Sequence, residues 1–318
     1  CDDNNAIVAA LLARKARKPV KIINTREEEF LAGSRPRVPM KIWVKMGFKK
    51  DGRIRAKQIR VVADNGAYCG KAPAITGVAA LRHDTCYKYS DVKTQAYLVY
   101  TNKIPTGAFR GFGNPSAEWA VEQAIDKGAH ELSIDPLELA RLNAAIPGYV
   151  SPHGNRVTSC ELKQCIDQVE KMMDWKEKQS SKGPKRGLGL ACTVHVSGKR
   201  HFGDYDGGSA TIKINEDGKV LILSGEGESG QGAATAMCQI AAEEIGVPLD
   251  DVNYSEADTD LTTFCLGAFG SRLTYIAGNA VKDAASKAKG QLLETAAEML
   301  EASPDDLVSQ DGRIFVRG

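Results

Sequence analysis

The sequence lacks several features that would assign it a simple function. Its 318 residues include only five histidines, and its eight cysteines contain no Cys-x-x-Cys pair. This scarcity argues against a histidine-built metal site, a zinc ribbon and a disulfide framework. The motifs Gly-x-Ser-x-Gly and His-Glu-x-x-His are also missing, which removes two common hydrolase signatures. No apolar run approaches the roughly 18 residues that a membrane-spanning helix needs.

The charge is almost balanced, because 42 Lys and Arg residues face 40 Asp and Glu residues. A net charge of +2 gives no sign of the clustered basic face of a nucleic-acid binder. The chain is 42% hydrophobic and 26% charged, and it is long enough for two cores. We expect two domains, residues 1–148 and 149–318. The scattered cysteines favour a reduced, cytoplasmic protein without a membrane partner.

Apolar periodicity predicts helices and strands in both halves of the chain. The expected helices are 2–18, 114–128, 133–143, 232–245 and 277–300. The expected strands are 20–24, 40–48, 54–63, 93–100, 187–196, 209–214, 219–223 and 252–256. Because helices and strands do not alternate regularly, the predicted fold class is α+β, with two mixed sheet-and-helix domains.

Three glycine-rich loops stand directly before helical patterns, at Gly107–Gly113, Gly225–Gly232 and Gly267–Arg272. Glycine lets the backbone approach a ligand closely, and the free amides of a helix N-terminus attract anions. Together the loops predict one extended anionic ligand that is held at several points. For any single loop, an ordinary turn is the alternative.

The second loop also has the spacing of a dinucleotide-binding fingerprint, Gly225-x-Gly227-x-x-Gly230. Two observations weaken that interpretation. Glu226 and Glu228 would lie beside a pyrophosphate, and the preceding strand is expected to belong to a hairpin rather than a parallel unit. An NAD(P)-dependent dehydrogenase built on this loop therefore stays as an alternative.

In their order and separations, the three loops resemble landmarks of the molybdenum hydroxylases. These landmarks belong to the molybdopterin-binding large subunit of that family, which includes xanthine dehydrogenase, aldehyde oxidase, carbon monoxide dehydrogenase and hydroxybenzoyl-CoA reductase. The resemblance covers essentially the whole chain. The matching segments are 109–113, 230–232 and 267–272, with further similarity at 10–15, 25–28, 86–88 and 134–136.

The resemblance implies a molybdenum that is held by molybdopterin, in its cytosine dinucleotide form, with no protein side chain bound to the metal. Arg110 would be catalytic and would lie beside the oxygen ligands of the metal, and Phe112 would form a wall of the substrate pocket. The cofactor-binding residues implied by the match are Phe109, Arg110, Ser229, Gly230, Gln231, Gly232, Gly270, Ser271 and Arg272.

The activity implied is hydroxylation, or reductive dehydroxylation, of an aromatic, N-heterocyclic or aldehyde substrate. Electrons would leave through iron–sulfur centres and FAD on other subunits or segments. The expected partners are therefore an iron–sulfur subunit and a FAD subunit, or the remaining parts of the large subunit. Purine hydroxylases have an arginine where this chain has Val78, which disfavours a purine.

Three parts of the family pattern have no match in this chain: an early glycine loop, a glutamine near the metal and a late glutamate that serves as the base. We therefore expect an internal fragment, or one part of a divided subunit, that is inactive alone. A non-catalytic assembly module with the same fold is a further alternative.

Overall fold

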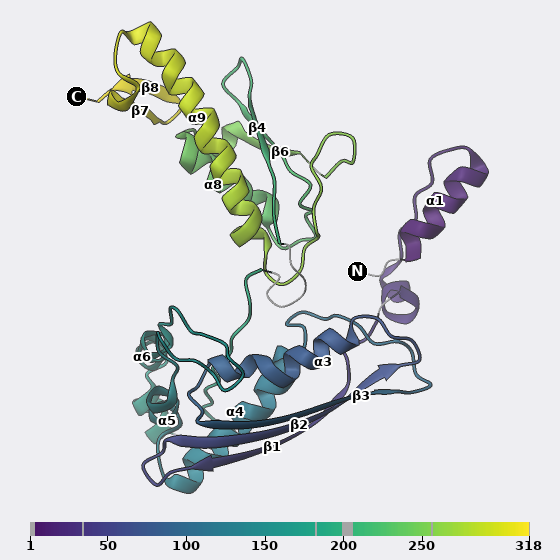
Figure 1. Ribbon diagram of the computed structural model, residues 1–318, viewed down its shortest axis with the longest axis vertical. Helices are drawn as coiled ribbons and strands as arrows, with labels where there is room; N and C mark the ends of the chain where they lie inside the picture. Colours follow the sequence, from purple (N-terminus) through teal and green to yellow (C-terminus); the bar gives the residue numbers. More distant parts are fainter. Residues whose placement is uncertain (1–3, 34, 182, 199–205, 256, 318) are drawn as a thin grey trace. The chain divides into compact units, whose positions relative to one another are not determined.

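The computed structural model describes residues 4–33, 35–181, 183–198, 206–255 and 257–317 (Figure 1). The chain forms two compact units, Cys1–Val194 and His195–Gly318. Each unit has its own hydrophobic core. The units divide later than the boundary expected after residue 148, because Ile166, Trp175 and Cys192 are buried in the first core.

The first unit is built on a three-stranded mixed sheet. Its first two strands form an antiparallel hairpin, closed by an Asp51–Gly52 turn, and the third strand pairs parallel with the second. Alternate residues of the second strand, such as Ile59 and Val61, are fully buried against the helices. The strands are β1 (Met40–Phe48), β2 (Ile54–Gly66) and β3 (Asp91–Tyr100), and they confirm the predictions at 40–48, 54–63 and 93–100.

Helices α3 and α4 cover one face of this sheet (Figure 1). The helix expected at 114–128 continues past Gly128 to residue 132. Gly128 serves close packing instead, because a Cβ there would lie 2.5 Å from the Phe48 ring. The helical segments of this unit are α1 (Asn4–Ala16), α2 (Arg26–Glu28), η1 (Glu29–Gly33), α3 (Ala72–Leu81), η2 (Arg82–Thr85), α4 (Asn114–Leu132), α5 (Pro136–Asn143), α6 (Leu162–Met172) and α7 (Trp175–Ser180).

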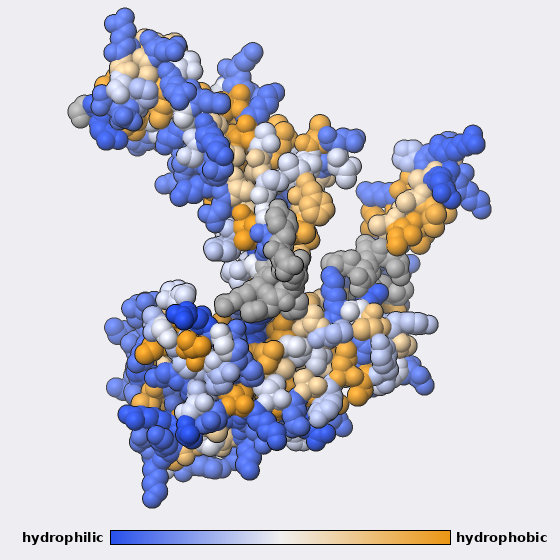
Figure 2. All heavy atoms as spheres, in the orientation of Figure 1, coloured by the Kyte–Doolittle hydropathy of each residue, from blue (hydrophilic) through white to orange (hydrophobic). Residues whose placement is uncertain are grey.

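Helix α1 confirms a helix within residues 2–18, but its apolar stripe stays at the surface. Ile7, Val8, Leu11 and Leu12 are 45–64% exposed, and Figure 2 shows hydrophobic side chains along this helix. None of the helices in the described ranges is both long and apolar enough to cross a membrane.

The second unit repeats the plan of the first. An antiparallel hairpin is followed by a helix and a parallel third strand, and a glycine loop then leads into a long helix. The main elements are β4 (Thr211–Ile214), β5 (Val220–Leu223), α8 (Ala233–Ile245), η3 (Leu249–Asp251), β6 (Val252–Ser255), η4 (Leu273–Ala277) and α9 (Gly278–Leu300). A terminal hairpin comprises η5 (Pro304–Asp306), β7 (Leu307–Gln310) and β8 (Arg313–Val316). The α+β class is confirmed, and the repeat was not visible in the sequence.

Two predicted strands are wrong. Residues 20–24 join no sheet, and Ile23 is 72% exposed, so apolar composition alone did not make a buried strand. Residues 187–196 are also outside any strand. In that segment the amides of Cys192 and Val194 bind glutamate side chains of α4 rather than a neighbouring strand.

Candidate functional site

The loop Gly107–Gly113 turns sharply before α4. Three successive residues have left-handed backbone angles: φ is +90° at Gly111, +48° at Phe112 and +96° at Gly113. Glycine is required at the last position, since a Cβ would lie 2.4 Å from the carbonyl oxygen of Ile75. The turn leaves Arg110 exposed and packs Phe112, partly buried, against the first core.

Arg37 supports this loop from a separate segment. Its Nη2 donates to the carbonyl oxygen of Arg110 at 2.7 Å, and its guanidinium lies 4.5 Å from the centroid of the Phe109 ring. The amide of Gly107 also donates to the carbonyl of Pro36 at 3.0 Å. Sequence analysis missed Arg37, because the contact joins residues 73 positions apart and no motif marks it.

The loop Gly225–Gly232 leads from β5 into α8, and its backbone amides bind a carboxylate. Oε1 of Glu228 accepts from Gly230 at 2.7 Å and Gly232 at 3.1 Å, while Oε2 accepts from Ala234 at 3.0 Å. These backbone hydrogen bonds, that of Ala234 first, lower the pKa of Glu228. The start of α8 therefore provides a set of donors suited to an anionic oxygen group.

The other predicted residues of this loop are gathered at the surface. Oε1 of Gln231 accepts from the amide of Ser229 at 2.6 Å and from its hydroxyl at 2.8 Å, and Nε2 donates to Gly227 at 2.9 Å. A Cβ at Gly227, Gly230 or Gly232 would meet no atom within 4 Å. The backbone of the loop is therefore open to a ligand on that side.

Arg272, at the end of the third loop, is 0% exposed. Its Nε donates to Asp206 at 2.8 Å, its Nη1 donates to Glu226 at 3.0 Å, and its Nη2 donates to the carbonyl of Gly207 at 2.6 Å. The guanidinium is thus used within the protein, and the expected contact of Arg272 with a cofactor stays a prediction. The neighbouring Ser271 is exposed, with φ at +52°.

The second and third loops lie against each other within the second unit. A Cβ on Gly225 would lie 1.9 Å from the carbonyl oxygen of Thr263. The thiol of Cys265 donates to Glu226 at 2.7 Å and accepts from the amide of Gly267 at 3.0 Å. In the dinucleotide interpretation Glu226 would lie beside a pyrophosphate, whereas the structure shows it buried and bound to Arg272 of the third loop.

One reason given against a dinucleotide site is wrong. Strand β5 belongs to a hairpin with β4, but it also pairs parallel with β6 across α8. The loop therefore does stand in a β–loop–helix–β unit. Glu226 and Glu228 point to Arg272 and to the α8 amides, so their position alone does not exclude a pyrophosphate.

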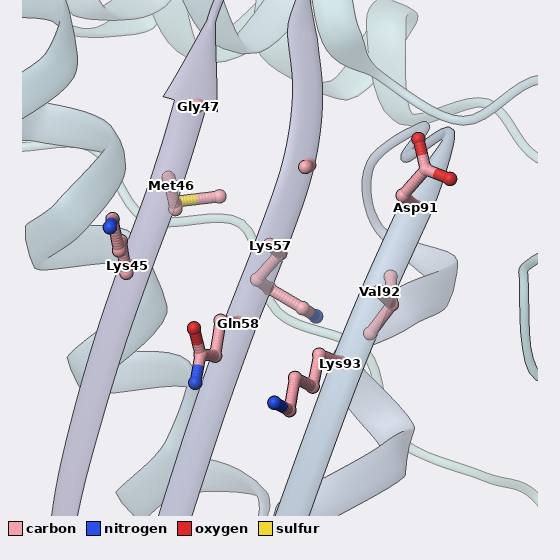
Figure 3. A pocket seen from close by; sticks show the side chains of 9 residues that line it. Lys45, Met46, Gly47, Lys57, Gln58, Asp91, Val92 and Lys93 are labelled. Carbon is pink, nitrogen blue, oxygen red and sulfur yellow. The ribbon is translucent and has the colours of Figure 1, made fainter.

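A different hollow, of about 380 Å³, lies on the sheet of the first unit (Figure 3). Lys45, Gln58 and Lys93 line it from three adjacent strands in matching register. Lys57 also lines it, but its ammonium group is buried and pairs with Asp84. None of the predicted site residues lines this hollow.

Comparison with known proteins identifies the family. Two models, each described as a molybdopterin cofactor-binding domain, match residues 4–144 and 166–318. The chain belongs to the molybdenum hydroxylase family and contains two of its molybdopterin cofactor-binding domains. The resemblance stated from the sequence is confirmed. The boundary after residue 148 falls between the two matches and stays a prediction.

The similar proteins include subunits of larger oxidoreductases. The xanthine dehydrogenase molybdenum-binding subunit of Escherichia coli O157:H7 is 36% identical, over 98% of this chain and 42% of that subunit. The nicotine 6-hydroxylase large subunit of Paenarthrobacter nicotinovorans is 29% identical, over 97% and 40%. The structure of quinoline 2-oxidoreductase from Pseudomonas putida 86 superposes with a TM-score of 0.86, 29% identity and coverage of 98% and 42%. The chain thus spans about two fifths of its relatives' length. Neither the NAD(P)-dependent dehydrogenase nor the assembly module is favoured.

Proposed function

We propose that this chain is the cofactor-holding part of a molybdenum-dependent oxidoreductase. The enzyme would hydroxylate, or reductively dehydroxylate, an aromatic, N-heterocyclic or aldehyde substrate. The observation that carries the proposal is the match of both halves of the chain to molybdopterin cofactor-binding domains. The exposed glycine loops before α4 and α8 supply the surfaces that such a cofactor needs.

The residues of the second unit fit a phosphate-bearing pterin. The amides of Gly230, Gly232 and Ala234 already converge on one carboxylate, so the same donors suit a phosphate of the cytosine dinucleotide form. Ser229 and Gln231 would hydrogen-bond the cofactor from the same loop. Gly270, which is partly buried, and the exposed Ser271 would approach it from the third loop. When bound, the molybdenum cofactor supplies the two-electron redox chemistry and the oxygen transfer.

In the first unit, Arg110 would donate to the oxygen ligands of the metal. Its guanidinium is exposed, while its backbone is fixed by Arg37, so the side chain is held ready without being engaged by its support. Phe109 would contact the cofactor, and Phe112 would form a wall of the substrate pocket. The partly buried ring of Phe112 packs on the core, which gives that wall a fixed position.

For the substrate we propose an N-heterocycle that is not a purine. Two relatives are named for nicotine and quinoline, which are N-heterocycles. The residue at the position of the purine-contacting arginine is Val78, which is only 6% exposed on α3 and offers no charge. The 36% identity with a xanthine dehydrogenase subunit supports a purine instead. Assays with purines and with other N-heterocycles therefore distinguish the two substrate classes.

We further propose an iron–sulfur subunit and a FAD subunit as partners, and a cytoplasmic location. Removal of two electrons from the substrate requires an acceptor chain beyond the pterin. The cysteines in the described ranges are free, as expected of a reducing compartment.

Cofactor extraction tests the proposal. The chain is expressed with its neighbouring subunits in a host that makes molybdopterin, and metal, fluorescent pterin and nucleotide are then measured. We expect molybdenum, pterin and CMP in equal amounts, and loss of turnover with retained protein in R110A. A bound nicotinamide nucleotide, or a stable complex that never contains molybdenum, would contradict the proposal.

A further inference from the structure

The backbone of the last residues of the first unit is hydrogen-bonded to side chains of α4. The amide of Cys192 donates to Oε2 of Glu122 at 3.1 Å, and the amide of Val194 donates to Oε1 of Glu118 at 2.9 Å. Nδ2 of Asn114 donates to the carbonyl of Val194 at 2.9 Å. Three side chains of a helix thus bind the backbone of a segment that the sequence had suggested to be a strand.

The spacing of side chains along α4 matches the spacing of amides along the segment Cys192–Val194. Asn114, Glu118 and Glu122 are four residues apart and lie on one face of α4, with a rise of about 6 Å between successive side chains. In an extended chain, alternate residues such as Cys192 and Val194 are separated by about 6.6 Å. The helix face therefore presents acceptors at nearly the same interval as the segment presents amides, with the two running in opposite directions.

Burial makes these contacts necessary. Asn114 is 3% exposed, Glu118 is 7% exposed and Glu122 is 9% exposed. A buried carboxyl group is costly unless donors satisfy it. Burial raises the pKa of Glu122 to about 7, and it also raises the pKa of Glu118. Oε2 of Glu122 accepts from two neutral donors, the Cys192 amide at 3.1 Å and the hydroxyl of Tyr87 at 3.1 Å.

We propose that Asn114, Glu118 and Glu122 form a polar track that clamps the segment Cys192–Val194. The track anchors the point at which the chain leaves the first unit for His195, where the second unit begins. Because α4 starts directly after the Gly107–Gly113 loop, the loop and this exit segment are attached to the same helix. A displacement of the helix start therefore moves the exit segment. The clamp does not depend on the proposed function, since all of its contacts lie within the chain.

Hydrogen exchange resolved to single residues tests the clamp in the full chain. In E118A we expect the Val194 amide to exchange roughly tenfold faster or more, and in E122A the Cys192 amide, because each loses its own acceptor. E118Q and E122Q keep a carbonyl acceptor and should retain most of the protection. D126A removes an exposed acidic residue of the same helix and serves as the matched control.

The pattern of exchange decides the outcome. Selective acceleration of one amide by each alanine variant, with rescue by glutamine, supports the clamp. Unchanged exchange at both amides in E118A and E122A would overturn it. An equal acceleration throughout β1, β2 and α4 would also overturn it, because the glutamates would then stabilise the unit generally without holding this segment. If wild-type protein binds no molybdenum while the alanine variants still show selective acceleration, the proposed function is contradicted and the clamp is supported.

Discussion

The first and third glycine loops have similar sequences but use their arginines differently. Both contain Gly-Ala-Phe followed by an arginine, and both lead into a long helix. In the first loop, Arg110 is exposed and only its carbonyl is held, by Arg37. In the third loop, Arg272 is 0% exposed and binds Glu226 and Asp206.

The difference lies in the surrounding charges rather than in the motif. A guanidinium leaves water only where carboxylates and carbonyls replace its solvation, and Glu226, Asp206 and Gly207 do so for Arg272. The carbonyl of Arg110 instead binds a second arginine, Arg37. A second positive charge does not replace the solvation of the Arg110 guanidinium, so that group stays in water. Arg272 therefore holds two loops together, whereas the Arg110 side chain stays exposed.

Removing the buried arginine should give the largest effect. R272M leaves Glu226 buried without its counter-charge, and we expect the second unit to lose about 3–5 kcal/mol of unfolding free energy. R110M, the matched change in the exposed arginine, should stay within about 0.5 kcal/mol. Urea unfolding with hydrogen exchange of β5 and α8 measures both. The double variant E226Q/R272M should recover part of the loss, and equal stability of R272M and R110M would refute the contrast.

The packing of the second loop against Thr263, which lies just before the third loop, can be tested with glycine substitutions. G225A places a Cβ 1.9 Å from the Thr263 carbonyl, so backbone must move, and we expect a loss of about 2–3 kcal/mol. G227A meets no atom within 4 Å and requires no left-handed backbone, so it should change stability by less than about 0.5 kcal/mol. Thermal unfolding of the pair checks this. Similar melting temperatures of G225A and G227A would mean that Gly225 is not packed closely against the Thr263 carbonyl.

Much of the local structure could be predicted from the sequence. The Asp51–Gly52 turn, the Asp135–Pro136 helix start and the strands at 40–48 and 54–63 follow from neighbouring residues, and the structure agrees. Helix α3 was missed, and 187–196 was wrongly predicted as a strand. That apolar segment has the composition of a strand, but Glu118 and Glu122, about 70 residues away, take its amides.

The candidate site was predicted only in part for the same reason. The exposed loop around Ser229 and Gln231 follows from glycine spacing and helix capping. The orientation of Arg272 could not be predicted, because Asp206 and Glu226 are 66 and 46 residues away. The support given by Arg37 has no local signal either. Contacts between distant residues decide which arginine is buried and which stays exposed.

A buried carboxyl group that has no arginine partner should make the free energy of unfolding depend on pH. A carboxyl group that is paired with a buried arginine should not do so in the same range. Burial raises the pKa of Glu122 from 4.5 to about 7, so the folded state keeps a proton that the unfolded chain has released. This contribution to stability is present in full below about pH 4.5 and is lost as the pH rises through about 7. We expect a change on the order of 2 kcal/mol across this window.

The control for the pH experiment is E122Q, which cannot titrate at this position. Urea unfolding of the first unit between pH 5 and 7.5 should show the wild-type free energy falling relative to E122Q as the pH rises. D126N, an exposed change on the same helix, should keep the wild-type slope. The other groups around the Glu122 carboxyl are Glu118, Cys86, Tyr87, Tyr89 and Cys192. Burial raises the pKa values of these thiols and phenols, so they stay protonated between pH 5 and 7.5. A parallel course for wild type and E122Q would therefore show that titration of Glu122 does not cause the pH response.

The smallest expected effect concerns Arg37, the support of the exposed arginine. R37Q removes the donor to the Arg110 carbonyl and the stacking on Phe109, and we expect a loss of about 1 kcal/mol. Exchange of the Phe112 amide, which donates to Phe109 at 2.9 Å, should rise because the turn loses its outer support. R37K keeps the charge but loses the planar donor, so its stability should lie between those of the wild type and R37Q. If the loop exchanges normally in R37Q, the turn is held by its own left-handed residues, and Arg110 needs no support from outside the loop.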